Sequence, residues 1–127
     1  ITGDLITKEE EVELTIELGV KDIRKSLDFY TNILGFSLHR MGTDGKFAII
    51  SFGKSILMLA GIEKLPEPRF SGLEEIRILV PDVDSVYKKV CERGGTIHKP
   101  LADASYGLRT FDVKDPDGAV IKFASLI

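Results

Sequence analysis

Apolar and polar residues alternate at two places in the chain, and each alternation leads into a helical pattern. From Val12 to Val20 every second residue is apolar, which is the period of a strand with one buried face. Asp22 then supplies an N-cap, and apolar residues recur at helical spacing as far as Gly35, a residue type that commonly ends helices. Short apolar runs separated by glycine-containing turns predict further strands over 36–41, 46–52 and 56–60.

The same order of patterns returns in the second half of the chain. Apolar residues alternate with others from Glu75 to Val80, and Asp82 offers a second N-cap. A helical stripe of apolar residues follows and ends at Gly94 and Gly95. Strands are then predicted over 96–99, 108–113 and 119–124, the last two joined by the turn Asp115–Gly118.

The two halves align at an offset of sixty residues, in strand phase and in helix caps together. The aligned pairs are Ile16 with Ile76, Leu18 with Ile78, Val20 with Val80, Asp22 with Asp82, and Gly35 with Gly95. Each repeated unit buries its apolar face only against a neighbour, so the repeat determines the expected fold. We predict one α+β domain over 1–127: two tandem, pseudo-twofold βαβββ modules, about 12–62 and 73–127, form half-barrel sheets around a cleft, and 63–72 is a linker.

Composition and charge narrow the class of partner. The 127 residues are 43% hydrophobic and 29% charged, which is typical of a globular protein. The net charge of −3, with acids and bases interleaved, provides no basic stripe for nucleic acid. Apolar runs such as 56–62 are far shorter than the roughly 20 residues that span a bilayer, so no membrane partner is expected. The N-terminus has no signal-peptide pattern, and we expect a cytoplasmic protein.

Cys91 is the single cysteine, which excludes intramolecular disulfides and multi-cysteine zinc sites. Its position after Tyr87 and Val90 in a helical pattern predicts a small buried core residue rather than a nucleophile. Tyr30 and Tyr87 lie on the apolar stripes of the two predicted helices, and we assign both to packing.

Several segments of both halves together resemble one known family. They are Val20–Tyr30, Ile33–Phe36, Val80–Asp84, Gly94–Gly95, Tyr106–Gly107 and Asp115–Gly118. In this order and spacing they are similar to the glyoxalase, bleomycin-resistance and extradiol-dioxygenase superfamily, over nearly the whole chain after the first ten residues. The resemblance implies two βαβββ modules curling around a cleft, often in a homodimer that completes or exchanges them.

Metal-using members of that superfamily place His or Glu at matching strand positions in both modules. Counted from the flanking motifs, these positions hold Thr15, Met58, Glu75 and Lys122 here. Of these four side chains, only that of Glu75 is of a type that could serve as a metal ligand, and a lysine ammonium repels a cation. We therefore expect neither a metal ion nor another cofactor. His39 and His98 fall on other strands, where we expect surface or edge positions.

The predicted cleft mixes charged and apolar side chains, as small-molecule sites commonly do. We place on its concave face Thr15, Glu17, Met58, Ala60, Glu75, Arg77 and Lys122, and near its mouth Phe47, Ile49, Tyr106 and Arg109. We expect one of two roles for the residues at the mouth. Either the Tyr106 loop folds over a ligand and Arg109 binds a carboxylate or phosphate, or both residues only pack. Glu75 and Lys122 either contact the ligand or form a structural ion pair with each other, and Glu75 is a weak candidate for a general base.

These observations favour a metal-independent binding protein of the bleomycin-resistance type, which sequesters an amphipathic small-molecule ligand in a dimeric cleft. The second hypothesis is a lyase, isomerase or dioxygenase of the same superfamily with an atypical site. Enzymatic activity is therefore left open, and the residues at the four counted positions favour its absence. A regulatory or protein-interaction module is the third, with the charged arm Lys8–Glu11 reaching across a dimer.

Overall fold

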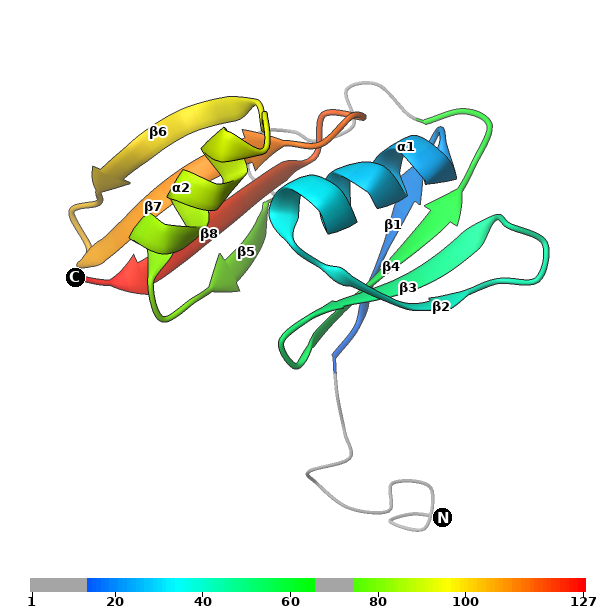
Figure 1. The fold of residues 1–127 in the computed structure, drawn as a ribbon, viewed down its shortest axis with the longest axis horizontal. Helices are drawn as coiled ribbons and strands as arrows, with labels where there is room; N and C mark the ends of the chain where they lie inside the picture. Colours follow the sequence, from blue (N-terminus) through cyan, green and yellow to red (C-terminus); the bar gives the residue numbers. More distant parts are fainter. Residues whose placement is uncertain (1–13, 66–74) are drawn as a thin grey trace, which may run out of the picture.

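The computed structural model describes residues 14–65 and 75–127, which form two modules with the same order of elements (Figure 1). The first contains β1 (Ile16–Val20), α1 (Ile23–Asp28), the π-helical segment η3 (Phe29–Leu34), β2 (Ser37–Met41), β3 (Phe47–Phe52) and β4 (Ser55–Gly61). The second contains β5 (Ile76–Leu79), α2 (Val83–Glu92), β6 (Ile97–Asp103), β7 (Leu108–Lys114) and β8 (Val120–Leu126). The predicted α+β class and the βαβββ repeat are confirmed.

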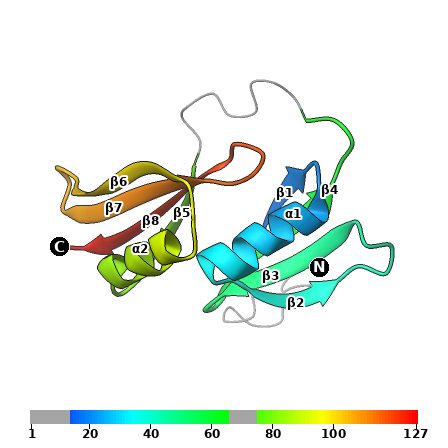
Figure 2. The same ribbon diagram turned by 45° about the horizontal axis from the view of Figure 1, so that its top comes forward.

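Each module has its own four-stranded sheet. Sheet A has the order β1-β4-β3-β2 and sheet B the order β5-β8-β7-β6. The first strand of each module runs parallel to the last, and the other neighbours are antiparallel. β1 and β5 are therefore edge strands, and neither sheet closes into a barrel within the described chain. The helices cover one face of each sheet (Figures 1 and 2), and we call the opposite one the helix-free face.

The two helices begin at the predicted aspartates but end differently. The Asp22 side chain accepts from the backbone N–H groups of Arg24 and Lys25, and the Asp82 side chain accepts from that of Ser85. Gly35 ends the first helical segment with φ 95°, but the left-handed residue after α2 is Gly94, with φ 81°. Gly35 and Gly95 thus align in sequence without sharing a conformation.

The hydrophobic core lies on the helix-covered side of both sheets and joins the two modules. Phe52 of β3 and Phe123 of β8 meet across the module boundary, with ring centroids 5.8 Å apart. α2 contacts η3, and the modules lie side by side in Figures 1 and 2. Aromatic pairs of this kind contribute about 0.5–1.5 kcal/mol beyond their area burial, so the boundary is a packed interface.

A buried hydrogen bond adds to this interface. The Tyr30 hydroxyl, fully buried on η3, donates to Asp115 Oδ2 at 2.8 Å, although the two residues lie 85 apart in sequence. The other oxygen of Asp115 accepts from the backbone N–H groups of Asp117 at 2.9 Å and Ala119 at 2.8 Å. Tyr30 therefore packs as predicted, and it also attaches the helical segment of one module to the turn 115–118 of the other.

The structure corrects the prediction for Cys91, whose side chain is exposed. Val90, its neighbour, is fully buried, and one step along a helix turns the side chain by about 100°. β6 also extends beyond the predicted 96–99 to Asp103 and includes Pro100, which an edge strand tolerates because its outer N–H groups have no partner strand.

Parts of the prediction lie outside the described residues. These are the strand residues 12–13, the arm Lys8–Glu11, and Pro66, Pro68 and Gly72 of the predicted linker. Leu65, also assigned to the linker, is buried with 8% of its surface exposed. Neither helix in 14–65 and 75–127 has the length and apolarity that a bilayer crossing needs.

Candidate functional site

The helix-free face of sheet A has an apolar centre with charged ends. Met58 of β4 pairs in register with Glu17 of β1 and Ile49 of β3, and Ile49 pairs with Arg40 of β2. Paired residues share a face, and the alternate residues of these strands are buried under α1, so this row faces away from the core. Ala60 and Phe47 form the next row on the same side. Thr15 precedes β1 and is exposed, and strand alternation places it with Glu17.

One end of this face is covered by the chain that follows β4. Gly19 pairs with Ala60, and a Cβ at Gly19 would lie 2.7 Å from Ile62 Cδ1 and 3.5 Å from Leu65 Cδ2. Ile62 and Leu65 therefore lie against the helix-free face at the end of β1, where only a glycine leaves room for them. The accessible apolar area of sheet A is consequently the part around Met58.

The helix-free face of sheet B has a charged centre. Lys122 of β8 pairs in register with Arg77 of β5 and Asp112 of β7. Its Nζ lies 3.6 Å from Asp112 Oδ1 and 3.8 Å from Glu75 Oε1, with 13% of the side chain exposed. Arg77 donates from Nε at 2.9 Å to Glu75 Oε2 and has Nη2 2.8 Å from the same oxygen. The hydrogen bond to Glu75 is the main cause that raises the pKa of Arg77 above its ordinary value.

Two cations and two carboxylates thus neutralise each other on this face. The ion pair of Glu75 with Lys122, one of the two predicted alternatives, is present. Asp112 is a second partner of Lys122 that the sequence analysis missed. It is 3% exposed, and its Oδ1 accepts no hydrogen bond from a described residue. No signal in the sequence indicated this burial, because Asp112 alternates with the apolar Phe111 and Val113 and therefore occupies a polar strand position of β7.

Tyr106 contributes an aromatic ring to the same face. It lies in the turn between β6 and β7 with 56% of its surface exposed, and the Arg77 guanidinium is 5.7 Å from its ring centroid. The turn therefore brings Tyr106 to Arg77, a residue of the opposite edge strand. An exposed arginine and tyrosine pair offers planar surfaces on which a ligand can stack.

The donor set at the four counted positions does not suit a divalent cation. Threonine and methionine stand at two of them, and the ammonium of Lys122 places a positive charge at a third. Within 14–65 and 75–127, no three His, Cys, Asp or Glu side chains converge as a metal site requires. His39 and His98 are exposed and lie on the edge strands β2 and β6.

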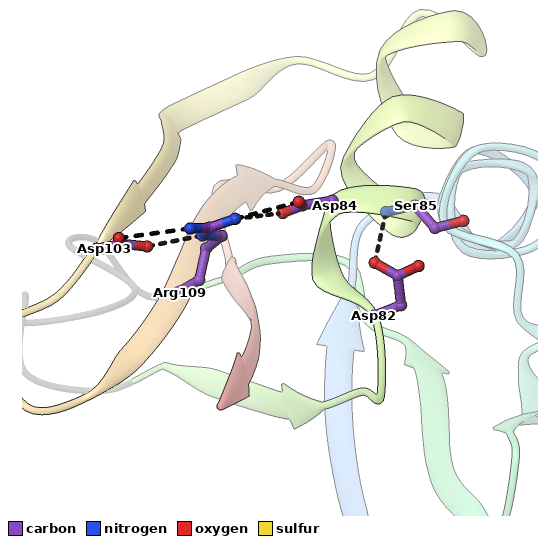
Figure 3. A network of polar contacts seen from close by, with 5 residues as sticks. All are labelled: Asp82, Asp84, Ser85, Asp103 and Arg109. Carbon is purple, nitrogen blue, oxygen red and sulfur yellow. Dashed lines mark hydrogen bonds and ion pairs between the residues drawn. The ribbon is translucent and has the colours of Figure 1, made fainter. Parts of the chain in front are cut away.

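Arg109 lies away from both helix-free faces. It pairs with Ser125 and shares the strand phase of Phe111, so its side chain is on the side of sheet B that α2 covers. Figure 3 shows its guanidinium between two carboxylates: Nε donates to Asp103 Oδ1 at 2.7 Å and Nη1 to Asp84 Oδ2 at 3.1 Å. Arg109 therefore ties the hairpin of β6 and β7 to the start of α2, and its fork is already engaged.

The hydrogen bond from Arg109 holds the pKa of Asp103 below its ordinary value. A carboxyl whose pKa is lowered in the folded state contributes stability at higher pH, and this contribution is lost as the pH falls below about 4. We expect Arg109→Gln to raise the Asp103 titration midpoint towards the ordinary value, as measured by NMR of the side-chain carboxyl. Arg24→Gln, which removes an exposed charge on α1, should leave the midpoint unchanged; an equal shift in both variants would contradict the assignment.

Between the two modules lies a crevice of about 270 Å³, lined by residues of β1, β4 and β5. Of its described lining residues, only Arg77 belongs to the predicted site. Thr15 and Met58 belong to sheet A, whereas the ion pairs of Glu75 and Lys122 stay within sheet B. Apart from Arg109, the predicted site residues therefore form two faces, one on each sheet.

Comparison with known proteins agrees with this architecture. The sequence model of the Glyoxalase/Bleomycin resistance protein/Dioxygenase superfamily matches residues 14–123. The chain belongs to this superfamily. It is 26% identical over 125 residues to the uncharacterized protein YraH of Bacillus subtilis (strain 168), covering 90% of this chain and 98% of that protein.

Solved structures share the fold. A glyoxalase/bleomycin resistance protein/dioxygenase from Alicyclobacillus acidocaldarius superposes with a TM-score of 0.80 at 19% identity, covering 95% of this chain and 96% of that one. TioX from Micromonospora sp. ML1 superposes with a TM-score of 0.73 at 23% identity, covering 91% and 97%. At these identities the likeness establishes the fold alone, and the chemistry of the site rests on this chain's own residues.

Proposed function

We propose that this member of the superfamily binds a small amphipathic organic molecule without a metal ion, in a cleft completed by a second copy of the chain. The observation that carries the proposal is the position of Lys122 Nζ, 3.8 Å from Glu75 and 3.6 Å from Asp112. A lysine in this place supplies the positive charge that balances the carboxylates, so the site is electrically complete without a divalent ion.

The two helix-free faces are complementary to the two parts of an amphipathic ligand. Met58, Ile49 and Phe47 on sheet A are half-buried and offer an apolar surface for its body. Arg77 and Tyr106 on sheet B offer a planar cation and an exposed ring, and Glu75 offers a carboxylate. Recognition combines burial of apolar area with a few polar contacts that orient the ligand, as in most small-molecule sites.

A second copy is part of the proposal because each face is open in one chain. β1 and β5 are edge strands, and an edge strand presents unpaired N–H and C=O groups to another chain. Leu79 and Leu126 share the phase of Arg77 and Lys122, respectively, and are 69% and 84% exposed. Placing β1 of one copy beside β5 of its partner brings the Met58 face next to the Lys122 face and covers exposed apolar surface.

Titration of the dialysed protein with a panel of planar drugs and small amphipathic metabolites tests this function. We expect at least one compound of the panel to bind. Its affinity should fall about tenfold, or 1.4 kcal/mol, in the variant Met58→Lys, because the change puts a charge into the apolar centre of sheet A. Leu38→Lys makes the same change at an exposed residue of β2 and should leave the affinity unaltered. No binder in the panel, a monomeric mass in solution, or a stoichiometric metal content by elemental analysis would each count against the proposal.

A further inference from the structure

The crevice between the modules is a different surface from the helix-free faces. Ile16 pairs with Leu57, which is 4% exposed and faces the core, so Ile16 points to the helix-covered side of sheet A. Ile76 and Ile78 point to the helix-covered side of sheet B in the same way. The crevice is thus an opening into the core at the module boundary, with Phe36 at its floor.

The shape and lining of the crevice suit a small molecule with an apolar body. Its volume of about 270 Å³ lies just below the roughly 300–1,000 Å³ of common ligand pockets. Aliphatic and aromatic side chains form most of the described lining, and Ile16 at the mouth is 44% exposed. The edge strands β1 and β5 both contribute residues to the crevice.

The charged residues at the mouth of the crevice favour one sign of charge on the ligand. Lys54 and Arg77 are the charged members of the described lining, and no acidic residue is among them. The guanidinium of Arg77 is engaged by Glu75, whereas Lys54, in the turn between β3 and β4, forms no ion pair with a described residue. Ser55 adds a hydroxyl donor next to Lys54. An anionic head group is therefore complementary to the mouth.

We propose that this crevice is a second binding site, which takes a small carboxylic acid with an aliphatic body, such as a medium-chain fatty acid. The aliphatic body lies against Leu57, Ile76 and Ile78, and the carboxylate lies between Lys54 and Ser55. Burial of the aliphatic body supplies most of the binding free energy, and the head group orients the ligand.

Calorimetric titration with octanoate and with octylamine tests the choice of ligand, since the two share an aliphatic body and differ in charge. We expect octanoate to bind about tenfold more tightly than octylamine, a difference of 1.4 kcal/mol. Lys54→Glu changes an exposed side chain and should reverse this preference. Lys46 is an exposed lysine in the turn before β3, and Lys46→Glu should preserve the preference. Equal affinities for the two probes, or no binding of octanoate, would overturn the proposal.

Two adjacent residues of β1 separate this site from the helix-free face. Ile16→Trp fills the crevice and should abolish octanoate binding, while Glu17→Trp puts the same bulk on the helix-free face and should leave it intact. Circular dichroism of both variants checks that they are folded. If Glu17→Trp alone removed octanoate binding, the crevice proposal would fail while the proposed cleft stood. If no compound of the panel bound to the cleft while octanoate binding still required Ile16, the proposed cleft function would fail and the crevice proposal would stand.

Discussion

Replacing Lys122 with methionine is expected to lower the free energy of unfolding by about 3 kcal/mol, because the change leaves a buried carboxylate without its cation. Asp112 is 3% exposed, and Lys122 is its ion-pair partner in the described structure. Glu75 loses less, because 29% of its side chain is exposed and Arg77 remains bound to it. Denaturant unfolding of the two proteins measures the difference.

The matched controls separate this ion pair from a general effect of charge. Lys99→Met removes a lysine from β6, opposite Asp112 in register, but Lys99 is exposed and should cost less than about 0.5 kcal/mol. The double variant Lys122→Met with Asp112→Asn should regain most of the lost stability, since no buried charge is then left unpaired. A loss in the double variant as large as in Lys122→Met would show that packing rather than charge is responsible.

Replacing Asp115 with alanine has the second large expected effect, a loss of about 3 kcal/mol in the free energy of unfolding. Its carboxylate accepts hydrogen bonds from the Tyr30 hydroxyl and from the N–H groups of Asp117 and Ala119. Without it, the hydroxyl of a fully buried tyrosine and the N–H of a fully buried Ala119 lose this acceptor. Thermal or denaturant unfolding provides the measurement.

Two tyrosine variants divide this effect into its parts. Tyr30→Phe removes only the bond between the modules and should cost about 2 kcal/mol, because the buried carboxylate loses a donor. Tyr87→Phe makes the same change on α2, where the half-buried tyrosine makes no side-chain hydrogen bond to a described residue, and should cost less than about 0.5 kcal/mol. Equal losses in the two variants would contradict the role of Asp115 in joining the modules.

The strand phase of β7 shows a signal that was present in the sequence and was misread. Phe111 and Val113 are apolar and alternate with Thr110 and Asp112, and both are fully buried. Arg109 has the phase of Phe111, so the alternation already placed it on the core side of the sheet. Its prediction as a cleft residue followed instead from its proximity to the Tyr106 turn.

Other contacts had no signal in the sequence. Arg77 lies on the edge strand β5 and Tyr106 in the turn between β6 and β7, and their contact depends on how this turn folds. Gly95 aligns with Gly35, but a Cβ there would lie 2.5 Å from Val90 Cγ1 and 3.0 Å from Ile33 Cγ2. Glycine is required at this position because Val90 of its own helix and Ile33 of η3 in the other module both lie close to it, and no pattern within residues 83–95 indicates the approach of η3.

The sequence by itself determined the order of strands and helices, the aspartate caps and the core faces of β1 and β5. These are local properties, because a period of two or of 3.6 residues decides which side chains share a face. The tertiary structure alone decided that Asp115 bonds to Tyr30, that Asp112 completes the ion pairs of Lys122, and that a crevice opens between the modules. Each of these depends on how strands pair and modules pack, and residues far apart in the chain carry no periodic record of that packing.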